Sequence, residues 1–173
     1  MNIQKIAREK MNGFERVLHK IPGFKGYFEK EFRRDADRVQ RDFIVTQLRK
    51  VKTGMNKVIQ AAARQKDFEL LREYDLFVRT LDKSIGAIRY ADQGYSGFFD
   101  LIKIGETELD KVYEKDALIA ETADSFCADF NKIATAPLEP SGLSPMRERL
   151  EQIDGLFEQR AALLKGYDKG ESK

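Results

Sequence analysis

Apolar residues return at helical spacing through most of the chain, and this periodicity limits the kind of fold that the chain can adopt. In the longest run the steps between apolar positions are 4, 3, 4, 3 and 4 residues, and in the next run they are 3, 4, 3, 4 and 3. Such steps form the heptad seam of packed helices, whereas strands need an alternation that persists nowhere in this sequence. The two runs are Ile44, Leu48, Val51, Met55, Val58 and Ala62, then Leu71, Tyr74, Val78, Leu81, Ile85 and Ile88. We therefore predict an all-α fold, an antiparallel bundle of four to five helices with long coiled-coil-like hairpins.

The phase of the seam changes between these two runs, and the change predicts a turn. Extending the first seam would place its positions at the charged residues Glu69 and Arg72. Asp67 is a suitable N-cap, so we predict that one helix ends near Lys66 and that a second returns antiparallel to it. A single long helix is the alternative, because neither Gly nor Pro marks the turn.

The other helices and the domain boundaries follow from the same spacing and from Gly and Pro. A first helix should end at Pro22, and a fourth, starting near Gly105, carries Asp116 as the one polar residue on its apolar frame. Ser144 before Pro145 is a typical helix start. We predict a main bundle over 1–136, a Pro-rich linker over 137–145, a C-terminal helix packed on the bundle over 146–167 and a frayed tail over 168–173.

Composition excludes several classes of protein. The 173 residues suffice for one domain with a sizeable core. No run reaches the ~18 apolar residues of a membrane span, and residues 1–14 lack the apolar stretch of a secretory signal, so we expect a cytoplasmic protein. One cysteine excludes an intramolecular disulfide, and one histidine excludes the paired Glu-x-x-His motifs of a di-metal bundle. We expect Cys127 to be a small buried residue, His19 to lie near a helix C-terminus, and no metal or cofactor site.

Charge is divided unevenly along the chain. Residues 1–66 have a net charge of +10 from 17 Lys and Arg against 7 Asp and Glu, and residues 67–173 have −8 from 14 against 22. One interpretation is that the basic helices pack beside the acidic ones, so that the charges set register. A second is that basic residues face solvent and bind phosphates. A third is that the first helix lies on an anionic membrane surface.

The second interpretation identifies candidate polyanion-binding residues. Two groups share a helix face by their spacing, in steps of 4 and 3 and in steps of 7 and 7. They are Arg34, Arg38 and Arg41, and Lys50, Lys57 and Arg64.

Two glycine-aromatic segments repeat one pattern, glycine, aromatic, any residue, glycine, aromatic, Phe, acid, at 23–29 and 94–100. If helices alternate in direction, both turns lie at the same end of the bundle. Their aromatic side chains then either cap the core or form a pocket for a protein partner. The residues are Phe24, Tyr27, Phe28, Tyr95, Phe98 and Phe99.

The strings IPGFKGYFEKEFRRDADR (21–38), IRYADQGYSGFFD (88–100) and LDKVYEKD (109–116) together resemble a family of small, uncharacterised bacterial helical proteins. The resemblance covers about residues 21–119. It implies a bacterial, cytosolic helical protein and assigns no catalytic residue, because that family has no established activity.

The sequence therefore predicts a non-enzymatic helical protein that acts as a protein-protein interaction module or scaffold and associates with itself or with another protein. The long seams and the lack of a catalytic constellation support this hypothesis. The alternative is a polyanion-binding module that holds nucleic acid or an anionic membrane surface on its basic N-terminal helices.

Overall fold

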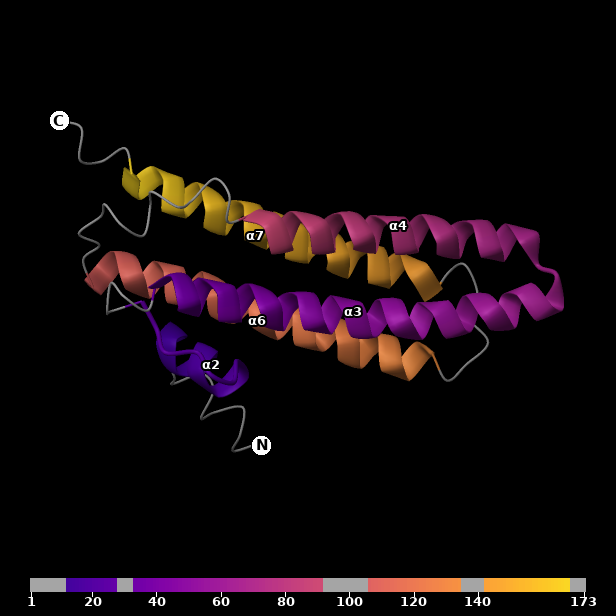
Figure 1. The fold of residues 1–173 in the computed structure, drawn as a ribbon, viewed down its shortest axis with the longest axis horizontal. Coiled ribbons are helices and arrows are strands. Elements are labelled where there is room, and N and C mark those ends of the chain that lie inside the picture. The colour runs from indigo at the N-terminus through magenta and orange to yellow at the C-terminus, as the bar shows by residue number, and fades with distance from the viewer. Residues whose placement is uncertain (1–11, 28–32, 92–105, 135–141, 169–173) are drawn as a thin grey trace.

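The computed structural model describes residues 12–27, 33–91, 106–134 and 142–168, which contain five α-helices and no strand (Figure 1). The helices are α2 (Gly13–Lys20), α3 (Arg33–Gln65), α4 (Phe68–Tyr90), α6 (Glu106–Ile133) and α7 (Leu143–Asp168). The four longer helices run side by side, and α2 packs against α6 near one end of the bundle. The predicted all-α bundle is confirmed.

The turn between α3 and α4 lies where the phase of the seam changes, so the predicted hairpin is confirmed. Lys66 adopts a left-handed conformation with a φ of 58°. Its N–H donates to the Ala63 carbonyl at 3.2 Å, and the Asp67 N–H donates to the Ala62 carbonyl at 3.4 Å. These two bonds form a Schellman motif, which ends a helix and is usually built on glycine. Asp67 is the N-cap of α4, because its carboxylate accepts the Leu70 N–H at 3.0 Å.

From α3 to α7 consecutive helices alternate in direction, as predicted, but α2 does not: Gly13 lies against Glu114 and Lys20 pairs with Asp124, so α2 runs parallel to α6. The prediction that the first two helices alternate is therefore wrong, because α6 is also parallel to α3.

α3 and α6 are parallel, since Gln40 bonds to Asp116 and, further along both helices, Gly54 faces Phe130. α7 runs antiparallel to α6 and parallel to α4 (Figure 1). The hairpin of α6 and α7 is therefore placed so that α6, rather than α7, lies beside α3.

Buried apolar residues form two clusters. The larger one fills the bundle between α3, α4, α6 and α7 and contains the predicted seam of α3, of which only Val58 is half-buried. The smaller one joins α2 and the segment after it to the start of α3, to α6 and to the end of α7. On α3, α6 and α7, charged residues lie where the two clusters meet, and this boundary is the first candidate site.

α7 begins earlier than predicted, at Leu143 instead of 146, so Ser144 and Pro145 lie in its first turn and not in the linker. Proline is tolerated there because the first N–H groups of a helix have no partner within it. Leu150 and Ile153 are buried in the larger cluster, which makes α7 part of the bundle core. Most of the expected tail lies outside the described residues.

α2 starts at a capping box and ends at Lys20, two residues before Pro22. Its N-cap is Asn12, whose side chain accepts the Glu15 N–H at 2.9 Å while the Glu15 carboxylate accepts the Asn12 N–H at 3.1 Å. This capping box starts the helix at Gly13, and residues 1–11 lie outside the described part. A Cβ on Gly13 would lie 2.5 Å from the backbone nitrogen of Glu114, so α2 packs directly on the backbone of α6.

Candidate functional site

A network of buried charged side chains lies at the boundary between the two apolar clusters. At its centre is Arg160 of α7, which is 3% exposed. The Arg160 Nε donates to Asp116 Oδ1 of α6 at 2.5 Å. Its Nη2 donates to Asp37 Oδ1 of α3 at 2.7 Å and to the Tyr27 hydroxyl at 3.1 Å. Two helices and the segment before α3 are thus tied to one guanidinium on a third helix.

The two buried aspartates extend this network to the rest of the bundle. Asp116 also accepts the Tyr27 hydroxyl at 2.6 Å and the Gln40 amide at 3.1 Å. Asp37 Oδ2 accepts the Arg41 Nε at 2.8 Å, and Arg41 Nη1 donates to the carbonyl of Arg89 in the last turn of α4 at 2.9 Å. All four long helices therefore meet in a network in which Arg41 and Arg160 balance Asp37 and Asp116.

Burial is the main electrostatic effect in this network. It raises the pKa of the Asp116 carboxyl above its usual value, so the loss of water outweighs the attraction of Arg160. Burial likewise raises the pKa of the Tyr27 hydroxyl well above its usual value, which keeps Tyr27 a donor. Within the described part of the chain, the only buried side-chain polar atom without a partner is Gln40 Oε1. Because its charges hold one another, this network can fix the register of the helices that it joins.

Two of the six predicted partner-binding aromatic residues lie among the described residues, and both belong to the core. Phe24 and Tyr27 are both buried, and their rings meet edge to face with centroids 5.3 Å apart. Tyr27 also stacks on Tyr113 at 5.3 Å, and the Tyr113 hydroxyl accepts the Tyr27 N–H at 2.6 Å. These contacts agree with the first of the two interpretations, in which Phe24 and Tyr27 cap the core. The other four candidates, Phe28, Tyr95, Phe98 and Phe99, lie outside the described residues.

The structure separates the predicted polyanion-binding residues into exposed and buried ones. The exposed ones are Arg34, Arg38, Lys50, Lys57 and Arg64. Arg41 is only 5% exposed and lies inside the ion network, so Arg34, Arg38 and Arg41 do not form one solvent-facing stripe. The reason is that Arg41 stands three residues before Ile44, at a position of the inward seam.

One face of α3 and its turn contains exposed cations and no acid. From 43 to 66 the sequence has no Asp or Glu. The one ion pair that the structure describes in this stretch joins Lys52 to Asp82 at 2.6 Å. The other exposed side chains of this stretch are cationic, neutral polar or alanine, and we call the surface that the cationic and polar ones form on one side of the helix the acid-free face. It consists of Arg49, Lys50, Thr53, Asn56, Lys57, Gln60, Arg64 and Lys66.

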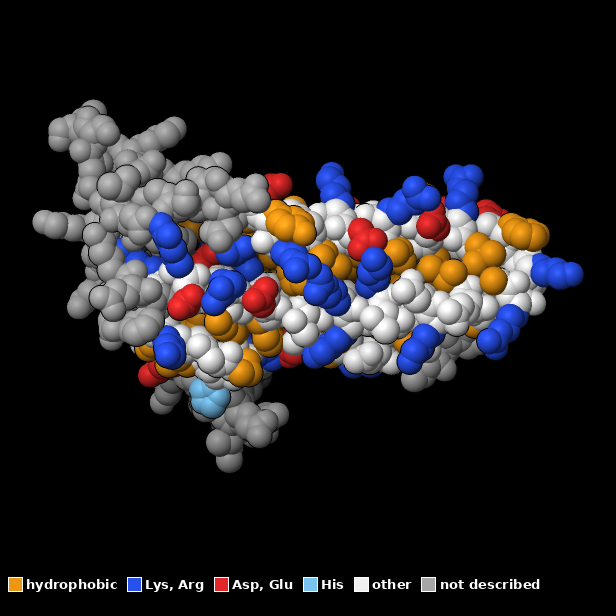
Figure 2. All heavy atoms as spheres, in the orientation of Figure 1, with side chains coloured by type: hydrophobic (Ala, Val, Ile, Leu, Met, Phe, Trp, Pro, Cys, Tyr) orange, Lys and Arg blue, Asp and Glu red, His pale blue; other side chains and the backbone are white. Residues whose placement is uncertain are grey.

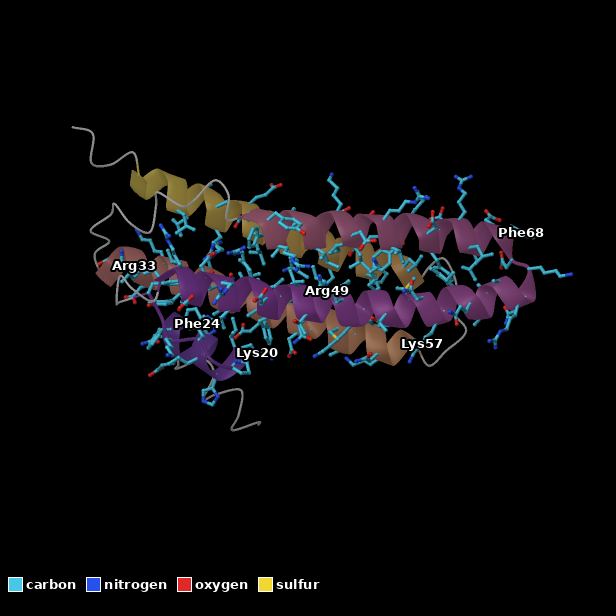
Figure 3. All side chains as sticks on the ribbon, viewed as in Figure 1. Lys20, Phe24, Arg33, Arg49, Lys57 and Phe68 are labelled. Carbon is cyan, nitrogen blue, oxygen red and sulfur yellow. The ribbon has the colours of Figure 1, made fainter. Side chains whose placement is uncertain are left out.

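Figure 2 shows Lys and Arg side chains outnumbering Asp and Glu along the bundle on the side that this view presents. Figure 3 places Arg49 and Lys57 on successive parts of α3, on the way to the turn. The acid-free face thus extends along the helix from its middle to the hairpin.

The basic residues of α2, in contrast, are paired with acids of α6. Arg16 contacts Glu114 at 2.7 Å and Glu121 at 2.8 Å, and Lys20 contacts Asp124. Charge complementarity between the two halves of the chain is therefore present at α2. Within α2, Val17 is buried in the smaller apolar cluster, whereas Leu18 is exposed.

Cys127 and His19 lie in different surroundings. Cys127 is buried in the larger apolar cluster, as predicted, and burial raises the pKa of its thiol. His19 is exposed in the last turn of α2. Among the residues whose placement is described, no cluster of His, Cys, Asp or Glu is arranged to hold a metal ion. None of the described helices has the length and apolar character needed to cross a membrane.

Comparison with known proteins identifies no relative. No protein-family model matches the chain, and no curated protein and no solved structure is significantly similar to it.

Proposed function

We propose that this protein is a non-enzymatic binding module that holds nucleic acid against the acid-free face of α3. The observation that carries the proposal is the row Lys50, Lys57 and Arg64, which is exposed and has no acidic partner in the described part of the chain. Cations that are not neutralised within a protein attract phosphates and release the counterions condensed on them.

The spacing of the row suits a linear polymer of phosphates. Steps of seven residues place successive cations about 10.5 Å apart on a helix, so the row spans about 21 Å from Lys50 to Arg64. Thr53, Asn56 and Gln60 stand exposed between them. Such side chains donate hydrogen bonds to phosphate and sugar oxygens, which position a strand without reading its sequence. We therefore expect affinity for nucleic acid without sequence specificity.

The same residues argue against a membrane surface as the partner of this face. Peripheral helices insert large apolar side chains into the lipid boundary. Between Arg49 and Arg64 the exposed side chains are cationic, neutral polar or alanine. Peripheral membrane contact therefore ranks below nucleic acid for this face.

A charge-reversal experiment tests the proposal. Lys50, Lys57 and Arg64 are changed to Glu together, and binding of a labelled oligonucleotide is measured by fluorescence anisotropy over a series of salt concentrations. The matched control reverses three exposed cations of α4, Arg72, Arg79 and Lys83, and has the same net charge. These control residues stand among Glu69, Glu73, Asp75 and Asp82 in the sequence of α4.

The wild-type protein should lose affinity steeply as salt rises. Each lost phosphate contact lowers the slope of log affinity against log salt by about 0.9 on duplex DNA, so the triple variant should lose about 3 units of slope. The control should keep most of the binding. No affinity at low salt for any nucleic acid, or an equal loss in both variants, would refute the proposal.

A protein partner remains the second hypothesis, but the fold supports it less. The seams that favour self-association are buried within one chain, since Ile44, Leu48 and Leu81 are fully buried in the larger cluster. Light scattering of the purified protein over a range of concentrations tests this point. A stable dimer whose interface covers α3 would favour the scaffold hypothesis.

We also propose a bacterial origin and a cytoplasmic location. The resemblance of 21–38 and 88–100 to bacterial helical proteins supports the first. A single buried thiol and a nucleic-acid partner fit the second. Fractionation of the native host with an antibody against this protein measures its compartment directly, and recovery outside the cytoplasm would contradict the location.

A further inference from the structure

We propose that Phe68 stacks on an unpaired base, so that the protein prefers single-stranded nucleic acid to duplex. The inference rests on the proposed function and narrows it from nucleic acid in general to single strands. It assigns a specificity-determining residue at the end of the acid-free face.

Phe68 is held out in solvent by the turn that precedes it. It is the first residue of α4 and is 77% exposed, far more than Leu76 at 46%, which also lies on α4. Asp67 caps the helix, and the two hydrogen bonds of the Schellman motif fix the backbone on the N-terminal side of Phe68. Figure 3 shows Phe68 where α4 starts, at the end of the bundle where the hairpin turns.

The exposed ring does not contribute to the core of the bundle. In the same part of α4, Leu70 and Tyr74 enter the larger apolar cluster, while Phe68 does not. Single exposed apolar side chains are common on protein surfaces, so the significance of Phe68 comes from its place at the end of the acid-free face.

Two exposed cations of the acid-free face, Arg64 and Lys66, precede this ring closely in the sequence. The exposed acids Asp67 and Glu69 are its direct neighbours, so the cations lie on the α3 side of the ring. Proteins that bind single strands combine cations that follow the backbone with aromatic rings on which bases stack. In a duplex the bases are already stacked and paired inside the helix, so an exposed Phe discriminates between the two forms.

Substitution of Phe68 tests the inference, because the side chain is exposed and its loss leaves the core intact. Phe68→Ala and Phe68→Tyr are compared with Leu76→Ala, a control at a second exposed apolar position of α4. Each is titrated with a single strand and with its duplex. Stacking contributes about 1–3 kcal/mol per base, so Phe68→Ala should weaken single-strand binding about 5- to 150-fold.

Duplex binding by Phe68→Ala should change by less than about twofold, and its salt slope should stay the same, because no phosphate contact is lost. Phe68→Tyr and Leu76→Ala should bind like the wild type. These results would support stacking at Phe68.

Failure of this inference can be distinguished from failure of the proposed function. If the wild type binds through Lys50, Lys57 and Arg64 while Phe68→Ala keeps its single-strand affinity, only the stacking inference is overturned. Equal losses on single strand and duplex would also overturn it. Loss of binding to vesicles of phosphatidylserine and phosphatidylcholine, with nucleic-acid binding unchanged, would reassign Phe68 to a membrane and overturn the inference as well. A wild type that binds no nucleic acid overturns both proposals.

Discussion

Replacement of Arg160 by Met tests whether the buried ion network holds the bundle together. Met removes the charge but fills much of the same volume. Asp116 would then lose the donor at 2.5 Å and Asp37 the donor at 2.7 Å, which leaves Arg41 as the remaining cation against two buried carboxylates. Removing one partner from a buried ion pair destabilises a protein by about 3–5 kcal/mol. We therefore predict a loss of about 4 kcal/mol in the free energy of unfolding.

Urea unfolding followed by circular dichroism measures this loss. With a denaturant slope of about 2 kcal/mol per molar urea, the midpoint should fall by about 2 M. Arg147→Met is the matched control on the same helix. Arg147 pairs with Glu73 at 2.6 Å, but the two side chains are 40% and 30% exposed. A surface pair of this kind contributes about 0–1 kcal/mol, so the control should unfold almost like the wild type.

The reasoning would be refuted if Arg160→Met lost less than about 1 kcal/mol, or no more than Arg147→Met, since the carboxylates would then be solvated or paired elsewhere. A double variant gives a second check. Neutralising Asp116 as Asn removes one of the charges that Arg160→Met leaves unpaired. Contacting residues couple by about 0.5–3 kcal/mol, so the double variant should be more stable than the sum of the two single losses predicts.

Four further substitutions are tested with the same unfolding assay. Lys66 has a φ of 58°, a conformation that glycine adopts without strain, so Lys66→Gly should stabilise the protein by about 1 kcal/mol; a destabilised variant would contradict the turn geometry. Gly54→Ala should destabilise it by about 1–3 kcal/mol, because the new Cβ would lie 2.8 Å from Cζ of Phe130. Gly86→Ala, where no atom lies within 4 Å of a new Cβ, should instead stabilise it by about 0.5–1 kcal/mol, and similar effects at both glycines would count against the packing. Burial raises the folded-state pKa of Asp116, so the stability linked to its proton is present below the unfolded pKa of about 3.9 and is lost as the pH rises through the folded pKa. The loss caused by Asp116→Asn should therefore be larger near pH 4 than near pH 7 (both approximate), and a loss that does not change with pH would contradict the prediction.

The heptad spacing also contains a signal for the buried ion network, although we predicted Arg41 to be a polyanion-binding residue. Continued toward the N-terminus of α3, the seam passes through Arg41 and Asp37. Asp116 lies on the apolar frame of α6, and Arg160 occupies a seam position of α7 between apolar residues. Charged residues at seam positions of three helices indicate a buried ion network. Which residues pair with one another does not follow from spacing, because that depends on how the hairpins are placed.

Two other features of the fold carry weak sequence signals. The turn at Lys66 uses a Schellman motif without glycine, so its usual marker is missing and only the change of phase predicts it. The parallel contact of α3 with α6 depends on which side of the first hairpin the second one packs, and periodicity along one helix contains no information about that choice. Gly13 allows α2, and Gly54 allows α3, to approach α6 closely. The sequence shows that a glycine is present but not which residue it contacts.

The cations of α3 are neutralised at one end of the bundle and left exposed toward the other. This difference is the physical basis of the proposed function. At one end the seam itself contains ions, and the bundle neutralises them by burying Arg41 and Arg160 against two aspartates. Toward the turn, the seam of α3 is apolar, so its cations lie outside the seam and reach solvent. Because the network fixes the rotation of α3, it also fixes which cations face outward. A variant that disturbs the network without unfolding the protein should therefore weaken binding at Lys57, even though it changes no residue of the acid-free face.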